Sequence, residues 1–443
     1  MLKPATLVSL AILCGGFQGS LNAATYDFKG PSPWPEIRKQ RIAELLPSAM
    51  QRAEVDAWLI VCRENNNDPL ADHIGCENAG QTAVFMFYFE QQQFRSIAFS
   101  PSGESTALAE LGLLDQVESL PRAGSAIDTA ATFIAEHDFN VIAINISDSN
   151  AQADGLSFSQ YRQLTTAVGP KYAPRLLSSD TLVYEWLSIK LPQEVDIMRY
   201  AAELTAAWQI EAYQQVVPGI TTDADVAAFL KQKMQQAGVT DAWAPNQSPN
   251  VNSGTDRGHS HATNRVIIAG DVIQTDFGIR LWDRWVTDIQ RFAYVLPANE
   301  TVVPEDILHY WNSAKQGREA AYQAMRPGVI GVEVDAAQRT VMEATGSLPV
   351  MRSTGHPVGY EAHDTGPNLG GSKAVSVRPA SQKTLAEGMT FAFDGFHSWF
   401  LPNGSPKTIS VEQMVVITAE GAEYLIPPQQ DLVLIPTLKR SQI

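Results

Sequence analysis

Five residues in the C-terminal half of the chain have types that could do chemistry together. They are Asp276, Asp288, His356, Asp394 and Glu412. Each of the four acids lies among strand-forming apolar residues, where a charge is costly unless it is paired or bound to a cation. Four carboxylates and one imidazole can hold two divalent ions; the oxygen-rich set favours Mn²⁺, and the imidazole also allows Zn²⁺, Co²⁺ or Fe²⁺. Such a pair can activate one hydroxide and polarise a carbonyl. An isolated acid is more often a solvated surface group, so the prediction depends on the whole set.

The elements that must position these groups belong to a chain of 443 residues, of which 44% are hydrophobic and 18% charged. This is the composition of a globular protein of two or three domains. In the first part, apolar runs predict strands over 55–61, 82–89 and 140–146, and helical patterns cover 36–53 and 126–136. The alternation indicates an α/β domain. It contains neither a phosphate-binding glycine loop nor a nucleophile elbow.

The second part follows a junction at 185–192. The pattern predicts helices over 193–217, 223–237, 305–325 and 332–344, the second capped by Thr221 or Thr222. Residues 266–296 are rich in β-branched and aromatic types, which predicts strands joined by tight turns.

The N-terminal segment predicts the cellular location, and the net charge limits the possible binding partners. Residues 1–24 combine Lys3 with an apolar stretch too short to span a bilayer and small residues near Ala23, which predicts a secretory signal peptide rather than a membrane anchor. The protein is therefore expected to be exported, periplasmic or secreted, with no membrane association after cleavage. A formal charge of −16 argues against nucleic-acid binding. Cys62 and Cys76 fit either a disulfide or two buried free thiols.

The order of short motifs gives the chain a family resemblance. They are Gly270-Asp271, Asp276-Phe277-Gly278, Thr287-Asp288-Ile289-Gln290-Arg291, Gly355-His356, Ala362-His363-Asp364, Glu387-Gly388-Met389 and Val411-Glu412-Gln413. In this order the chain resembles the pita-bread-fold metallopeptidases, which include methionine aminopeptidase, Xaa-Pro aminopeptidase, prolidase and the metal-free creatinase. It looks most like exported Xaa-Pro aminopeptidase-like proteins. The resemblance implies an α+β fold, with a creatinase-like α/β domain over 25–185, a pita-bread catalytic domain over 186–443 that opens with a helix at 186–206, and a homodimer.

The resemblance also implies a metal ligand set. Asp276 would bind one ion, Asp288 and Glu412 would bridge two ions, and His356 and Asp394 would complete the second. A bridging hydroxide would attack the scissile carbonyl of a small peptide.

Four residues acquire catalytic roles through the same resemblance. Asp394 would assist proton transfer, and His363 would stabilise the tetrahedral intermediate. His259 stands where the family keeps a histidine that faces the substrate, and His261 is its close competitor.

The chain departs from the family pattern at several positions. Asp288 follows Asp276 by one residue more than is usual, which would reverse its side chain unless a turn at 282–285 or a bulge absorbs the insertion. Asp394 replaces a glutamate. Arg352 replaces a histidine, and Ser410 an arginine, found near the substrate in proline-specific members.

These departures leave three hypotheses. The leading one is an exported dinuclear peptidase that hydrolyses short peptides near the N-terminus, Xaa-Pro bonds being one option. The second is a binding protein that has lost catalysis, and the third is a metal-free hydrolase of a small C–N substrate. The buried carboxylates argue against the third, because without cations their charges have no evident reason to be buried.

Overall fold

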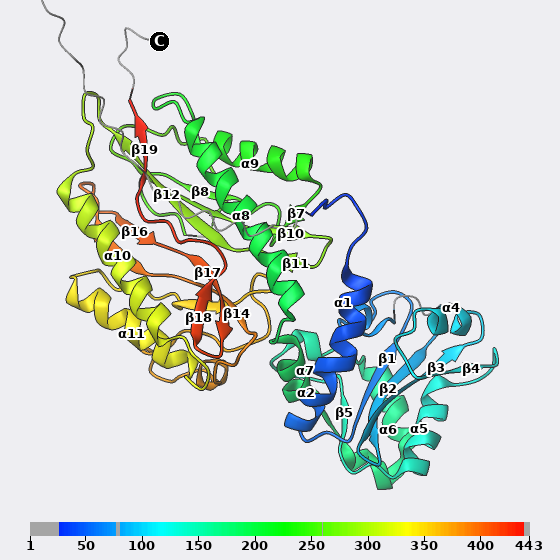
Figure 1. Cartoon of the computed structure of the whole chain (residues 1–443). Helices are drawn as coiled ribbons and strands as arrows, with labels where there is room; N and C mark the ends of the chain where they lie inside the picture. The colour runs from blue at the N-terminus through cyan, green and yellow to red at the C-terminus, as the bar shows by residue number, and fades with distance from the viewer. Residues whose placement is uncertain (1–25, 77–79, 259, 438–443) are drawn as a thin grey trace, which may run out of the picture.

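The computed structural model describes residues 26–76, 80–258 and 260–437. The segment expected to be a signal peptide and His259 lie outside this part of the chain. The described residues form two units that lie side by side (Figure 1).

The first unit is built on a six-stranded sheet of order β4-β3-β2-β1-β5-β6. Its strands are β1 (Ala57–Cys62), β2 (Ala83–Glu90), β3 (Gln93–Pro101), β4 (Gln116–Leu120), β5 (Ile142–Ile144) and β6 (Leu176–Ser178). The expected strands at β1, β2 and β5 are confirmed, whereas β3, β4 and β6 were not expected from the pattern.

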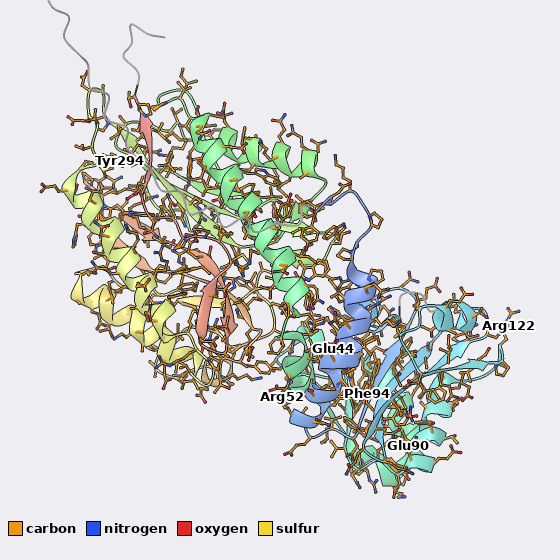
Figure 2. The ribbon with its side chains drawn as sticks, in the orientation of Figure 1. Glu44, Arg52, Glu90, Phe94, Arg122 and Tyr294 are labelled. Atoms are coloured by element: carbon orange, nitrogen blue, oxygen red, sulfur yellow. A yellow bond between two sulfur atoms is a disulfide. The ribbon has the colours of Figure 1, made fainter. Side chains whose placement is uncertain are left out.

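Helices cover both faces of this sheet. One face carries α1 (Trp34–Gln40), the π-helical turn Arg41–Leu45, α2 (Leu46–Arg52) and α7 (Asp180–Leu187); the other carries α5 (Ala126–His137) and α6 (Phe158–Tyr172). Because successive strand residues point to opposite faces, Trp58 and Ile60 of β1 join the first layer while Leu59 and Val61 join the second. Arg52, labelled in Figure 2, is the last residue of α2. It donates to Glu185 of α7 at 2.6 Å.

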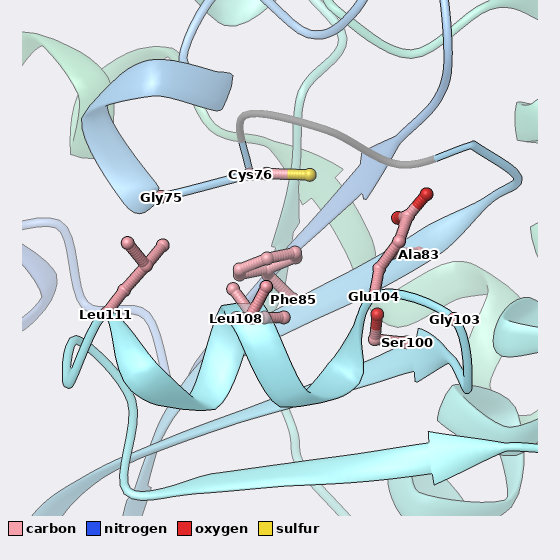
Figure 3. A pocket seen from close by; sticks show the side chains of 10 residues that line it. Gly75, Cys76, Ala83, Phe85, Ser100, Gly103, Glu104, Leu108 and Leu111 are labelled. Atoms are coloured by element: carbon pink, nitrogen blue, oxygen red, sulfur yellow. The ribbon is translucent and has the colours of Figure 1, made fainter.

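A disulfide and a cavity lie at one side of this domain. Cys62 and Cys76 are bonded, with Cα atoms 6.4 Å apart, so of the two readings of these cysteines the structure has the disulfide. The loop that it closes carries α3 (Ala71–Ile74). Beside it, Leu108 of α4 (Ser105–Glu110) and Leu111 border a 240 Å³ cavity with Phe85, and Glu104 stands at its edge (Figure 3).

Residues 188–191 connect the two units. The resemblance placed one continuous helix at 186–206, but α7 ends at Leu187 and α8 begins at Pro192 and runs to Gln214. The break has a local cause, because the residue before a proline is driven out of the helical region; Leu191 is extended, with ψ 154°. Next comes α9 (Asp223–Ala237), which Thr222 caps by accepting from the backbone N–H of Asp225.

The second unit places sheets of mainly antiparallel strands between two pairs of helices, β19 (Val433–Pro436) being parallel to its neighbour β12 (Ile289–Leu296). The helices are α8 with α9 on one side and α10 (Glu305–Ala324) with α11 (Gly331–Ala344) on the other (Figure 1). One four-stranded sheet has the order β19-β12-β9-β8, formed by Val433–Pro436, Ile289–Leu296, Val272–Phe277 and Asn250–Asn252. The other has the order β13-β14-β17-β18, formed by Gly355–Pro357, Thr390–Phe393, Gln413–Thr418 and Gly421–Tyr424. Strands β15 (Phe396–Phe400) and β16 (Pro406–Ser410) form a hairpin, and β7 (Thr240–Asp241), β10 (Ile279–Leu281) and β11 (Trp285–Val286) a small third sheet.

Within the described ranges, every helix is too short or too polar to serve as a bilayer span.

Candidate metal centre

The β9–β12 connection places Asp276 and Asp288 on one face. Asp276 lies directly opposite Gln290 in the ladder, and Asp288 precedes Gln290 by two residues, so all three side chains share a face. The chain reverses between the paired residues Leu281 and Trp285. The three-residue turn at 282–284 absorbs the additional residue, at the position expected from the sequence.

Asp283 and its neighbour Trp282 make this turn possible. Both have positive φ, 56° and 46°, and the N–H of Arg284 donates to the carbonyl of Leu281 at 2.9 Å. Positive φ at a turn is accessible to aspartate, whereas it is uncommon for a bulky tryptophan. The ring of Trp282 packs between Tyr26 and Phe28, which holds the residue in this conformation.

The second sheet supplies the other three members of the set. His356 lies in β13, Asp394 directly follows β14, and Glu412 lies between β16 and β17. The Nε2 atom of His356 is 3.7 Å from Oδ2 of Asp288 and 3.9 Å from Oε1 of Glu412. One ligand atom from each of these three residues lies within 4.8 Å of the others.

The pKa shifts of Asp288 and Glu412 show that all four acids are close enough to repel one another. The pKa of Asp288 lies well above its usual value, first because the carboxyl is buried and then because Asp276 and Asp394 repel its charge. The pKa of Glu412 is raised well above its ordinary value in the same way, by burial and then by Asp288, Asp394 and Asp276. Such mutual repulsion is what a bound cation would relieve.

The histidine is prepared to act as a ligand. Burial, and then the neighbouring His363, lower the pKa of His356 to about 4, so the imidazole is neutral at pH 7. Its Nδ1 lies 3.3 Å from the carbonyl oxygen of Pro357. A proton on Nδ1 that is donated to this carbonyl leaves the Nε2 lone pair directed at the carboxylates, as in metal-binding histidines.

A carboxylate oxygen of Glu412 gives a further reason to expect a divalent cation in the ligand set. Oε2 of Glu412 is buried and accepts no hydrogen bond from any residue that the structure describes. A buried carboxylate oxygen without a donor is costly, and a cation is the partner that would satisfy it. Oxygen donors with a single imidazole suit Mn²⁺ and leave Zn²⁺, Co²⁺ and Fe²⁺ open.

A network of amides around Asp276 was not found from the sequence. Gln290 Nε2 lies 3.4 Å from Asp276 Oδ2, while Gln290 Oε1 accepts from Ser410 Oγ at 2.6 Å and from Gln274 Nε2 at 2.8 Å. The signal that could have shown it is the presence of two glutamines in strands that are otherwise largely apolar. Ser410, which stands where the proline-specific members have an arginine, thus donates to Gln290, the neighbour of Asp276.

A cavity of 250 Å³ borders the amide network around Asp276. Its walls include Gln274, Asp256, Met351 and Arg352. Arg352 also acts on Glu412 by lowering its pKa against the larger effects of burial and the neighbouring acids. The cavity is lined by both polar and apolar residues, and its Gln274 donates to Gln290, the neighbour of Asp276; none of the five ligand residues lines it.

The remaining predicted catalytic residues take different places. The ring of His363 is exposed and meets the ring of His356 edge-on, with centroids 4.3 Å apart. Asp394 is 9% exposed and close enough to raise the pKa of both Asp288 and Glu412, after burial. His261 is an exposed loop residue, and His259 lies outside the described residues.

Comparison with known proteins places this geometry in a family. The model of metallopeptidase family M24 matches residues 196–419, just over half of the chain, and this range contains all five residues of the ligand set. The chain belongs to metallopeptidase family M24. A curated relative, "Probable dipeptidase PepE" of Mycobacterium tuberculosis, is 25% identical over 251 residues, which cover 56% of this chain and 61% of the relative. The chain thus spans about three fifths of the length of that relative.

Solved structures resemble the fold over most of the chain. The dipeptidase PepE of Mycobacterium ulcerans has a TM-score of 0.66 at 19% identity, covering 92% of this chain and all of that one. The X-Pro aminopeptidase of Thermotoga maritima has a TM-score of 0.64 at 21% identity, covering 88% of this chain and all of that one. At these identities the likeness concerns the fold, and it confirms the expected α+β pita-bread architecture with an N-terminal domain.

Proposed function

We propose that this M24 protein is a metal-dependent peptidase that hydrolyses short peptides near their N-terminus. The observation that carries the proposal is the convergence of four buried carboxylates and one neutral imidazole from two separate sheets. The relatives named as dipeptidase and X-Pro aminopeptidase support the same class of reaction. The acids that raise each other's pKa favour a bound cation, while the choice of hydrolysis over binding alone rests on these relatives.

The ligand set would divide between two divalent ions, of which Mn²⁺ is the first choice. Asp276 would hold one ion, Asp288 and Glu412 would be shared, and His356 with Asp394 would hold the other. Bound there, the ions would supply Lewis acidity and a water of lowered pKa.

The chain's own residues supply the rest of the chemistry. Asp394, the most exposed of the four acids at 9%, would take a proton from the attacking water and return it to the leaving amine. His363 presents an exposed ring beside His356, from where its N–H can donate to the carbonyl oxygen as negative charge develops there. The 250 Å³ cavity would receive a substrate side chain.

Proline specificity is the finer part of the proposal. A cavity of 250 Å³ suits a compact residue. Both the rigid Xaa-Pro dipeptide and other short peptides meet this condition. A panel of dipeptides and tripeptides with and without proline after the first residue decides between them; equal cleavage of both kinds would remove proline specificity.

Elemental analysis with a peptide screen tests the main proposal. We expect about two divalent ions per chain, activity that chelation abolishes and Mn²⁺ restores, and loss of activity in Asp276→Asn. The matched control is Asp68→Asn, which alters a buried acid of the N-terminal domain that is 4% exposed and should leave activity intact. A protein that binds no metal and cleaves no peptide after addition of Mn²⁺ or Co²⁺ would refute the proposal, and cleavage of a small C–N substrate that persists in chelator would support the metal-free hydrolase.

Export and assembly complete the proposal. We propose that residues 1–24 direct export and are removed, and that the mature protein is a homodimer. N-terminal sequencing of the native protein from a periplasmic or culture-medium fraction tests the first point, and light scattering tests the second. An intact N-terminus on protein confined to the cytoplasm would contradict export.

A further inference from the structure

Glu194 is a fully buried carboxylate at the junction of the two domains. It lies in the first turn of α8 and is 0% exposed. Its Oε1 accepts from the hydroxyl of Tyr360 at 2.5 Å and from the indole N–H of Trp285 at 3.1 Å. Its Oε2 accepts from Arg41 at 2.7 Å and from the backbone N–H of Leu191 at 2.9 Å. Both oxygens are thus fully used, and neither contacts the ligand set directly.

The two donors on Oε1 belong to the segments that carry the candidate centre. Trp285 lies three residues before Asp288, and Tyr360 lies between His356 and His363. These segments also meet through a backbone hydrogen bond from Val286 to Gly359 at 2.8 Å. A single carboxylate oxygen therefore joins the hairpin of one sheet to the loop that follows β13 in the other.

The charge on Glu194 is balanced from the N-terminal domain. Arg41 is 0% exposed and, besides Glu194, donates to the carbonyls of Trp186 at 2.7 Å and Ile189 at 2.8 Å. Burial opposes ionisation of Glu194, but Arg41 and the Tyr360 hydroxyl together hold the pKa of Glu194 below its usual value. A charged oxygen accepts stronger hydrogen bonds than a neutral one, so Arg41 strengthens the bonds to Trp285 and Tyr360.

We infer that Glu194 is a positioning residue that fixes the separation of Asp288 from His356 and His363, and that the N-terminal domain takes part in this through Arg41. The inference rests on the proposed function for its activity readout and goes beyond it by giving the N-terminal domain a role in the centre. Small displacements of positioned groups cost large factors in rate, and the partners that orient metal ligands affect affinity similarly.

The test compares two tyrosines that are equally buried. Tyr360→Phe removes the donor to Glu194, while Tyr172→Phe removes a hydroxyl that donates to Ala135 at 3.2 Å in the N-terminal domain; both tyrosines are 5% exposed. We expect Tyr360→Phe to lower kcat about 10-fold to 100-fold, with KM changed less than about 3-fold, and to weaken Mn²⁺ binding to the metal-free protein about 10-fold. Tyr172→Phe should leave all three at the wild-type value while lowering the unfolding temperature similarly.

Outcomes of the calorimetric Mn²⁺ titration decide the inference independently of peptide cleavage. If wild-type protein cleaves no peptide, the proposed function fails, yet weaker Mn²⁺ binding in Tyr360→Phe than in Tyr172→Phe would still support positioning. Equal Mn²⁺ affinity and equal kcat in Tyr360→Phe and wild type would overturn it, as would equal losses in both variants. Glu194→Gln gives a second comparison, since glutamine keeps Oε1 as an acceptor but lacks the charge; it should show losses in the same direction, and wild-type values would again overturn the inference.

Discussion

The buried ion pair between Lys190 and Asp364 offers a quantitative test of how the connecting segment supports the catalytic domain. The two side chains are each 1% exposed, with Nζ 3.3 Å from Oδ2, and Lys190 also donates to the carbonyl of Leu187 at 2.6 Å. Asp364 follows His363 directly and accepts from the backbone N–H of Tyr360 at 2.8 Å. Lys190→Met removes one charge and leaves the other buried, which typically costs about 3–5 kcal/mol.

The magnitude converts into a measurable shift. At about 2–4 °C per kcal/mol for a domain of this size, Lys190→Met should lower the unfolding temperature by about 6–20 °C. Calorimetry gives the temperature, and urea titration gives the free energy of unfolding. Asp364→Asn should lower the free energy of unfolding by a similar amount. The double variant Lys190→Met/Asp364→Asn should lower it no more than either single change, because no unpaired charge then remains.

An exposed pair provides the control. Lys373 lies 2.6 Å from Glu343, with the two side chains 56% and 65% exposed, so Lys373→Met should change the free energy of unfolding by less than about 1 kcal/mol. A loss in Lys190→Met as small as that of the control, or a double variant whose loss equals the sum of the single losses, would refute the reasoning.

Three further predictions concern acid, metal and the disulfide. Burial and then His309 lower the pKa of His397 from 6.5 to about 4. The folded state therefore resists protonation, and the free energy of unfolding should fall as the pH drops through this interval. In urea titrations His397→Gln should lose less of this free energy than the wild type, and an unchanged pH slope would contradict the prediction. Because burial and neighbouring acids raise the pKa of Asp288 and Glu412, Mn²⁺ must displace protons; calorimetry in two buffers should show proton release and affinity that rises with pH, and pH-independent affinity would count against the ligand set. Replacing Cys62 and Cys76 by alanine should lower the free energy of unfolding by about 3 kcal/mol, the entropy expected for a closed loop of about 15 residues, and urea titrations that show no loss would mean that the bond does not contribute.

Several elements could be predicted because their signals are local. The strand over 82–89 and the helices over 223–237 and 305–325 follow from residues that are neighbours along the chain, and β2, α9 and α10 have nearly these bounds. The capping of α9 by Thr222 is local in the same sense, since the hydroxyl and the N–H that it accepts from are three residues apart. Strands β4 and β6 were missed because they are edge strands with exposed residues, which need no continuous apolar run. Strand β3 lies inside the sheet and was missed because Ser96 and Ser100 bound its short apolar run.

The candidate metal centre also has a part that the sequence predicts and a part that it does not. The sequence by itself determined which residues could serve as ligands, because acids in apolar strands are costly and their order resembles that of a family, and it indicated the turn at 282–285 that keeps Asp276 and Asp288 on one face. Only the tertiary structure decided that both sheets bring their ligands to one place, and that Gln290, Glu194 and Arg41 support them from elsewhere. These contacts join residues up to 166 positions apart. A hydrogen bond between residues so far apart produces no periodicity or spacing in the sequence by which it could be predicted.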